Sequence, residues 1–228
     1  MSITTKKHIP LTHIQKLIGA RMVQSKQNKP CFYIESKADV TELMGLRPKL
    51  RKSLGVKITT DAFYVRVLAL AAKQYPLTLG IIDGDNIIIP DSIDVGFAVN
   101  APQGLVVPVV KDADKKTLAE IAELEKTLIE RARDNQLTLE EIEGETIAMS
   151  NLGAYGTDSF FGIVPLPAST ILAVGNVDRE VVPVDGKPAE RKILSLSLAV
   201  DRRVVDEVYA AKFLNMICEQ LQNPQQLI

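Results

Sequence analysis

The chain has 228 residues, of which 46% are hydrophobic and 24% charged, and its formal net charge is −1. This composition is ordinary for a globular protein with one large domain or two small ones. The near-neutral charge gives no electrostatic reason to expect nucleic acid or an anionic membrane surface as a partner. No apolar run reaches the ~18 residues that indicate a membrane span, and the N-terminus is too polar for a signal peptide.

Cysteine and histidine are scarce, which narrows the available chemistry. Cys31 and Cys218 are too few for a disulfide framework and form no CxxC pair, so no metal site is predicted. They indicate buried thiols in a reducing compartment, and we expect a cytoplasmic protein, or a matrix protein if the source is mitochondrial. His8 and His13 are the only histidines, and we expect both to be surface residues without a role.

The first third of the chain predicts an arm, helices and a strand. Residues 1–10 are polar and indicate an arm. Thr12 is expected to cap a helix with Ile14, Leu17, Ile18 and Met22 on one face. A strand over residues 31–34 and a helix capped by Thr41 follow. The next helix, Phe63 to Tyr75, is expected to be capped by Thr60 or Asp61.

The middle of the chain alternates short strands with amphipathic helices. Residues 81–89 predict two strand pieces around a turn, and residues 93–99 and 105–110 predict further strands. Residues 117–133 predict a helix whose charged residues form a solvated face and whose inward residues are Leu118, Ile121, Leu124 and Leu128. Thr138 begins a capping-box pattern for a short helix.

The last third contains the longest predicted strand. Residues 146–152 form a strand that ends at Gly153, and the pair Asp185-Gly186 marks a hairpin turn. Residues 193–200 alternate as a strand with one buried face and end at a charged turn, after which a helix presents Val208, Phe213, Ile217 and Leu221. This mixed order of strands and helices predicts an α/β fold with one large mixed sheet covered by helices.

Several motifs, in order along nearly the whole chain, resemble one family. They are Ile18-Gly19-Ala20-Arg21-Met22, Asp39-Val40-Thr41, Gly104 to Val110, Thr146 to Gly153, Pro165 to Gly175, and Asp201-Arg202-Arg203-Val204-Val205-Asp206-Glu207. They are similar to the catalytic core of the dihydrolipoamide acyltransferase component of 2-oxo acid dehydrogenase complexes. That core belongs to the chloramphenicol acetyltransferase-like superfamily. The family pattern at the last motif is Asp-His-Arg, two residues, Asp-Gly.

The resemblance implies a chloramphenicol acetyltransferase-like fold and trimers with the active channel between subunits. It divides the chain into an arm (1–10) and an acyltransferase-type core (11–228), with no lipoyl or peripheral-subunit-binding domain. Coenzyme A and a lipoyl-linked acyl group are the implied substrates, and no covalently bound cofactor is expected. The implied partners are copies of this chain, a catalytic acyltransferase paralogue and other components of the complex.

The resemblance also assigns site residues. Arg202 stands at the position of the catalytic histidine and Glu207 at that of the glycine, while Cys31 replaces a second common histidine. Ser150 takes the position of the hydroxyl that donates to the oxyanion, and Asp206 the second acidic position. Alternatively, Ser150 is a strand-end hydroxyl that satisfies the backbone. Arg202 is expected to be buried against Asp206 or Asp201, and Arg21 is the family-suggested partner of Asp206.

Guanidinium stays protonated in proteins and cannot act as a base. Three functions therefore remain open: a core subunit that is non-catalytic or strongly impaired, an active acyltransferase that uses another base, and a binder of coenzyme A or acyl thioesters. The terminal aliphatic pair, Leu227 and Ile228, is expected to be left in water by a single chain. The resemblance implies that such C-terminal apolar residues join trimers into a larger particle.

Overall fold

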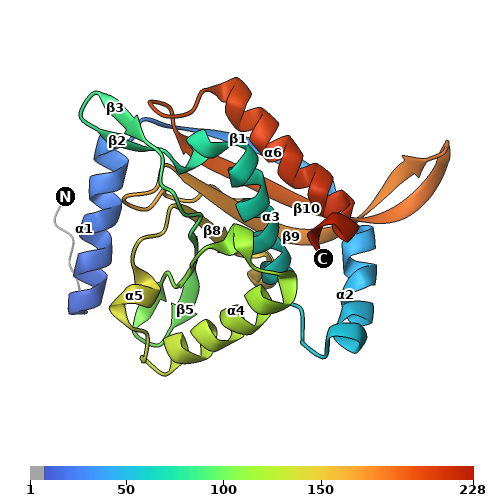
Figure 1. Ribbon diagram of the computed structural model, residues 1–228, viewed down its shortest axis with the longest axis horizontal. Coiled ribbons are helices and arrows are strands. Elements are labelled where there is room, and N and C mark those ends of the chain that lie inside the picture. The colour runs from blue at the N-terminus through green and yellow to red at the C-terminus, as the bar shows by residue number, and fades with distance from the viewer. Residues whose placement is uncertain (1–7) are drawn as a thin grey trace.

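The computed structural model describes residues 8–228, without the side chains of residues 13 and 14 (Figure 1). Most of the predicted N-terminal arm, residues 1–10, lies outside this part of the chain, and so do the side chains of His13 and Ile14. Among the helices of residues 8–228, none is long and apolar enough to cross a membrane.

A six-stranded mixed sheet forms the centre of the fold, in the order β1-β10-β9-β8-β4-β7. Its strands are β1 (Cys31–Asp39), β4 (Val95–Phe97), β7 (Val109–Val110), β8 (Ile147–Asn151), β9 (Thr170–Val184) and β10 (Lys187–Asp201). Strand β8 runs parallel to both of its neighbours, β4 and β9, and the other pairs are antiparallel. The predicted α/β fold with one large mixed sheet is confirmed.

Two small ribbons stand apart from this sheet. One pairs β2 (Ile81–Asp83) with β3 (Asn86–Ile88), as the turn between them predicts. The other pairs β5 (Val99–Ala101) with β6 (Gly104–Val106). The strands expected over residues 93–99 and 105–110 are each interrupted, since β4 and β7 join the main sheet while β5 and β6 leave it. Pro108, which has no N–H for a strand ladder, separates β6 from β7.

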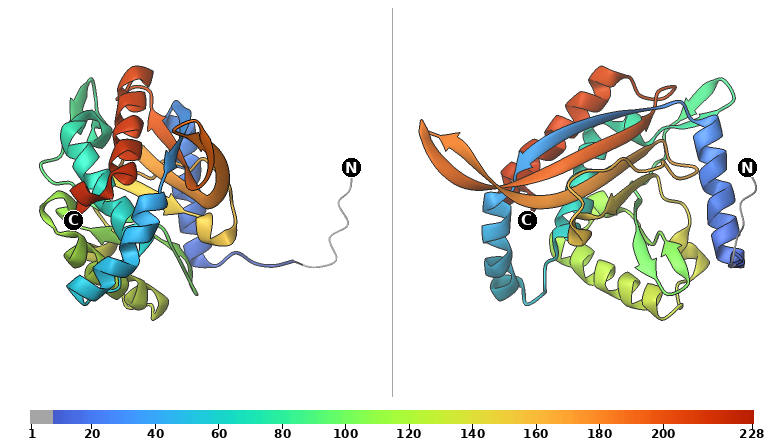
Figure 2. Two further views of the ribbon diagram at one scale, coloured as in Figure 1. Left: turned by 90° about the vertical axis from the view of Figure 1, so that its right-hand side faces the viewer. Right: turned by 180° about the vertical axis from the view of Figure 1, so that it is seen from behind.

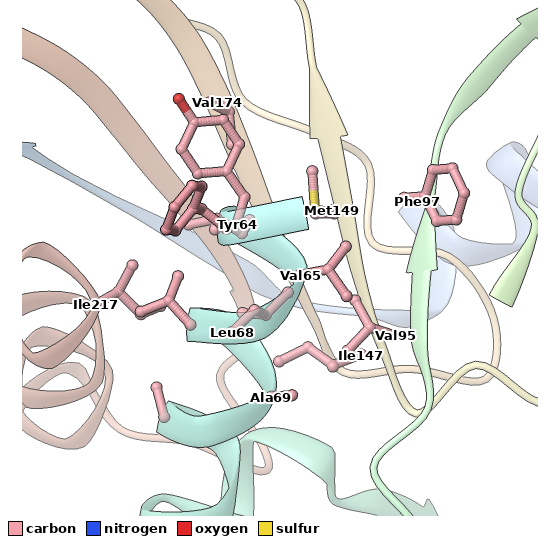
Figure 3. Close-up of a cluster of buried hydrophobic side chains, with 14 of the residues drawn as sticks. Tyr64, Val65, Leu68, Ala69, Val95, Phe97, Ile147, Met149, Val174 and Ile217 are labelled. Atoms are coloured by element: carbon pink, nitrogen blue, oxygen red, sulfur yellow. The ribbon is translucent and has the colours of Figure 1, made fainter. Parts of the chain in front are cut away.

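Helices α2 (Thr41–Leu54), α3 (Thr60–Gln74), α4 (Leu118–Arg133) and α6 (Glu207–Gln222) form a connected layer packed against the sheet. Helix α1 (His13–Asn28) lies outside this layer and contacts the loop before β9 through Ser25, and the remaining helix is the short α5 (Leu139–Ile142). Helix α3 contacts α4, α6 and β4, while α6 lies on β1 (Figure 1). Figure 3 shows Val65 and Leu68 of α3 beside Ile147 and Met149 of β8, with Ile217 of α6 nearby. Apolar residues occupy nearly every turn of α3, so it is buried on most sides.

Strands β9 and β10 form a hairpin whose outer part extends beyond the rest of the molecule (Figure 2). Its turn residues, Asp185 and Gly186, have φ values of 50° and 77°. Aspartate and glycine tolerate positive φ better than most residues, which suits them to a two-residue hairpin turn. The predicted hairpin is confirmed.

Two predicted helix starts are wrong by one or two residues. Thr59 caps α3 instead of the two residues after it, because its hydroxyl accepts a hydrogen bond from the Ala62 N–H at 3.0 Å. Thr41 lies inside α2, and its hydroxyl accepts instead from the Lys192 N–H at 2.8 Å, which ties α2 to β10. The predicted capping residues Thr12 and Thr138 are confirmed. Thr117, predicted as the first residue of its helix, is instead the N-cap of α4.

Three side chains lie on faces that the sequence pattern did not predict. Leu124 of α4 and Val208 of α6 are exposed, although both were expected to face inward. Glu125 is only 2% exposed, although the charged residues of α4 were expected to be solvated. Tertiary contacts explain this exception, because the Thr59 hydroxyl donates a hydrogen bond to Glu125 Oε2 at 2.5 Å.

The C-terminus folds back onto its own chain. A short turn of 3-10 helix, η4 (Pro224–Leu227), follows α6 and contacts α2 and α3. Leu227 is fully buried there, while Ile228 is 52% exposed. The expectation that a single chain leaves both terminal aliphatic side chains in water is therefore wrong for Leu227.

Candidate functional site

Ser150 lies near the end of β8, at the centre of the sheet. Side chains alternate along a strand. Ile147 and Met149 belong to the main core, while Ala148 packs on the opposite face with Val164. Ser150 shares the face of Ala148. Within the described part of the chain its hydroxyl makes no hydrogen bond, so it does not satisfy a nearby backbone group and is free to donate to a ligand.

The residues after Ser150 are held tightly. Asn151 Nδ2 donates to Asp61 Oδ1 at 2.5 Å, and Asn151 Oδ1 accepts from the Gly153 N–H at 2.9 Å. A Cβ on Gly153 would collide with the carbonyl oxygen of Gly175, so only glycine allows the turn to lie this close to β9. The Asn-Leu-Gly motif thus fixes the backbone that carries Ser150.

Two buried carboxyl groups behind this turn were not predicted to belong to the site. Burial raises the pKa of Asp61 against the opposing effect of its hydrogen bond from Asn151. Burial also raises the pKa of Glu125, to about 7, although the hydrogen bond from Thr59 lowers it. Asp61 stood out in the sequence only as a possible helix cap, because the pattern of α3 does not indicate which strand it faces.

The charged turn after β10 uses its two arginines differently. Arg203 forms a two-point ion pair with the buried Asp201, with Nε to Oδ1 at 3.0 Å and Nη2 to Oδ2 at 2.6 Å. Arg202 points outward, and its Nε lies 2.7 Å from Glu207 Oε1. The expectation that Arg202 is buried against Asp206 or Asp201 is therefore wrong.

The ion pair between Arg202 and Glu207 is partly solvated, with side chains 51% and 59% exposed. A hydrogen bond from its own backbone N–H, followed by that from Arg202, lowers the pKa of Glu207. Glu207 is therefore ionised at neutral pH and faces a guanidinium group, which stays protonated in proteins. Glu207 thus supplies the ion-pair partner of Arg202.

Asp206 is the N-cap of α6, where its Oδ1 accepts from the Tyr209 N–H at 2.8 Å. Arg21 is exposed on α1. Within one chain these two side chains form no ion pair among the described residues. The predicted pairing of Arg21 with Asp206 therefore has no counterpart inside a single chain.

Ser150 and Arg202 do not meet within one chain. Ser150 is opposite Ala173 of β9, and Ala173 is opposite Ser197 of β10. Arg202 comes five residues after Ser197, so at ~3.3 Å per residue it lies roughly 16 Å further along the strand direction. A site that uses both positions would need a second chain.

Lys29 and Cys31 lie beside the charged turn. Lys29 Nζ donates to the Pro165 carbonyl at 2.9 Å and to the Ala168 carbonyl, and burial lowers its pKa to about 8. Burial raises the pKa of the Cys31 thiol. Lys29 therefore anchors the loop before β9, and Cys31 stays a protonated thiol at neutral pH.

The layer of helices on a mixed sheet, with a hydroxyl at the end of its central parallel strand, defines a protein of the chloramphenicol acetyltransferase-like fold. Chloramphenicol acetyltransferase itself superposes with a TM-score of 0.51 at 13% identity, over 96% of this chain and 99% of that chain. Residues 4–228 match the model of the 2-oxoacid dehydrogenases acyltransferase (catalytic domain) family. The chain belongs to this family.

The names of relatives of this chain indicate different acyl groups and different complexes. The dihydrolipoyllysine-residue succinyltransferase component of Haemophilus influenzae is 31% identical over the whole chain and 56% of its own length. The branched-chain lipoamide acyltransferase component of Bacillus subtilis is 33% identical over 95% of this chain and 52% of its own length. The mouse mitochondrial pyruvate dehydrogenase protein X component is 33% identical over 98% of this chain and 45% of its own length. The chain thus spans about half the length of these relatives.

Two solved structures are similar to nearly the whole chain. The dihydrolipoamide acetyltransferase of Azotobacter vinelandii and the cubic core of a pyruvate dehydrogenase complex both have a TM-score of 0.93 and 29% identity, over 99% of this chain and 95% of theirs. In the Azotobacter protein, a serine, a histidine 52 positions later and an asparagine four positions after that were investigated for their catalytic roles. Ser150, Arg202 and Asp206 have the same spacing here.

Proposed function

We propose that this chain is an acyltransferase-type core subunit of a 2-oxo acid dehydrogenase complex that has lost most or all of its own acyl transfer. In this role it helps to build the core of the assembly. The observation that carries the proposal is Arg202 at the position of the base, held in an ion pair with Glu207.

The proposal rests on proton chemistry. Acyl transfer to coenzyme A needs a thiolate nucleophile, and a thiol with a pKa near 8.5 is mostly protonated at neutral pH. A guanidinium group cannot accept the thiol proton, because it stays protonated in proteins. Loss of a well-placed general base typically lowers the rate by ~10²–10⁴-fold.

Nearby groups do not supply a replacement. His8 and His13 belong to the N-terminal segment, far along the chain from the charged turn. Lys29 donates hydrogen bonds to two carbonyl groups, as an ammonium group does, so it is engaged in holding the loop. Glu125 has a raised pKa but is buried behind Ser150 against Thr59.

We further propose that the chain forms a homotrimer, in which Ser150 of one subunit approaches the Arg202 turn of the next. The separation of these positions within one chain supports this assembly, as does the likeness to a cubic core. The substrates of such a site are a dihydrolipoyl thioester and coenzyme A. A catalytic paralogue and the other components of the complex are the proposed partners.

A second function is favoured by the unbonded Ser150 hydroxyl. In a mixed trimer, this chain could lend Ser150 to the histidine of a catalytic paralogue, so that the subunit takes part in transfer without a base of its own. Co-assembly with a paralogue that lacks its serine would then restore turnover. The same co-assembly with Ser150→Ala in this chain would not.

The main test is acyl transfer between acetyl coenzyme A and dihydrolipoamide. We expect the unmodified homomer to show little or no turnover, and Arg202→His to raise it by ~10²–10⁴-fold. Arg202→His with Glu207→Gly is the stronger variant, because it also removes the carboxylate from the turn. Arg203→His is the matched control and should give no gain. Robust turnover by the unmodified protein, abolished by Ser150→Ala, would instead establish an enzyme with another base.

A further inference from the structure

Two cavities of different character meet at Ser150. One, of about 260 Å³, has a mixed lining of apolar side chains and of polar or charged ones that include Asp61, Asn100, Arg133 and Asn151. The other, of about 240 Å³, is lined almost entirely by apolar groups. Ser150 lines both cavities. A thioester carbonyl at its hydroxyl would therefore lie between a cavity that contains charged side chains and one that is almost entirely apolar.

Among the described residues that line the apolar cavity, none has a charged side chain, and the Ser150 hydroxyl is the only polar side-chain group. Its walls come from α1, the β5–β6 ribbon, β8, β9 and the loop before β9. The lining residues are Met22, Ala98, Leu105, Val107, Ala148, Met149, Ser150, Phe160, Phe161, Gly162, Ile163, Pro165 and Ile171. A group that enters this cavity therefore contacts mainly hydrocarbon, apart from the Ser150 hydroxyl.

The loop that forms the outer wall is fixed rather than loose. The Ser25 hydroxyl donates to the Val164 carbonyl, and Lys29 donates to the Pro165 carbonyl. The Phe161 ring lies against Tyr33, with centroids 5.1 Å apart. The cavity is thus preformed, which lowers the cost of ordering the protein when a ligand binds.

We propose that the acyl group accepted at this site is an uncharged aliphatic one, with its carbonyl at Ser150 and its hydrocarbon in the apolar cavity. This inference rests on the proposed acyl-thioester site. The inference predicts that this chain accepts acyl groups of the branched-chain or acetyl class and not of the succinyl class; all three classes are named among the relatives. The terminal carboxylate of a succinyl group would enter the cavity without a cation or a hydrogen-bond donor to balance it, which is strongly unfavourable.

Binding of coenzyme A thioesters to the unmodified protein tests the inference without any need for turnover. We expect isobutyryl coenzyme A to bind on the order of tenfold more tightly than acetyl coenzyme A, since it adds two apolar carbons. Succinyl coenzyme A should bind at least tenfold more weakly than isobutyryl coenzyme A. Equal affinities, tighter succinyl binding or no binding of any thioester would overturn the inference.

Ile163→Arg adds a cation to the wall of the cavity, and Ile88→Arg is the matched control on the distant β3 ribbon. Both isoleucines are partly exposed. We expect Ile163→Arg to narrow or reverse the preference for isobutyryl over succinyl, and Ile88→Arg to leave it unchanged. If Ile163→Arg instead dissociates the assembly, a second copy fills the cavity and the inference is wrong. If the Ile163→Arg protein does not fold, the order of the thioester affinities measured with the unmodified protein decides the test.

The outcome is separable from that of the proposed function. Robust turnover by the unmodified protein with the aliphatic ranking intact would overturn the impaired-subunit proposal and leave this inference standing. Absent turnover with equal binding of all three thioesters would leave the impaired-subunit proposal standing and overturn this inference.

Discussion

At the scale of single residues, the two adjacent arginines of the charged turn have different roles: Arg203 pairs with a buried carboxylate, whereas Arg202 pairs with one at the surface. Asp201 is buried at the end of β10 and would be costly as an unpaired carboxylate. Arg203 neutralises it with two parallel hydrogen bonds. Arg202 is left to pair with Glu207 at the surface, where an ion pair contributes little to stability. Its replacement should therefore change chemistry more than folding.

Glu125 provides a prediction about pH. The folded chain holds its proton up to about pH 7, whereas the ordinary value is 4.5. Between these values the folded state binds more protons than the unfolded state, so stability falls as pH rises through this window. We expect Glu125→Gln to remove this loss. Between pH 4 and pH 8, the free energy of unfolding of the variant should therefore fall by up to about 3 kcal/mol less than that of the unmodified protein.

Urea unfolding of both proteins at pH 4 and pH 8 measures the effect. The matched control is Glu123→Gln, an exposed position two residues earlier on α4. Equal pH dependence in the Glu125→Gln protein and the unmodified protein would show that Glu125 is already ionised when folded.

At the scale of elements, the long hairpin and the helix caps follow local rules. Thr117 caps α4 by accepting from the Glu120 N–H at 3.3 Å, while Glu120 Oε2 accepts from the Thr117 N–H at 2.7 Å. We expect Thr117→Ala to lower the free energy of unfolding by about 1 kcal/mol. Thr127→Ala, in the middle of the same helix, should cost less or even stabilise it, because alanine has the higher helix propensity. Thermal unfolding of the two variants gives the comparison, and a larger loss from Thr127→Ala would contradict it.

At the scale of the whole molecule, the two terminal aliphatic residues make separate contributions. Leu227 is buried in its own chain, so Leu227→Ala should cost about 2–5 kcal/mol of stability. Ile228 is half exposed and available to a neighbour. We expect deletion of Ile228 alone to leave the fold intact and to release trimers from a larger particle.

Light scattering at micromolar concentration measures the assembly. A monomeric full-length protein would contradict the proposed trimer. If the protein is trimeric both with and without Ile228, the exposed terminal side chain has no role in joining trimers.

Much of the fold could be predicted from sequence because its signals are local. The alternation over residues 193–200 matched β10, and the Asp185-Gly186 pair matched the hairpin turn. Predictions about which face of a helix is buried were less accurate, as Leu124 and Val208 show. The reason is physical: periodicity identifies an apolar stripe, but the neighbouring elements decide how far the burial extends around the helix.

The sequence by itself determined the family motifs, the order of the elements and the absence of histidine from the charged turn. It could not determine the partner of Arg202, the burial of Glu125, the half-buried position of Asp61, or the position of Ser150 between a mixed and an apolar cavity. Each of these depends on side chains that are brought together from distant parts of the chain, as when Asn151 meets Asp61 across 90 positions. Such contacts exist only once the sheet has assembled, because strand pairing and helix packing set them and local sequence preference does not.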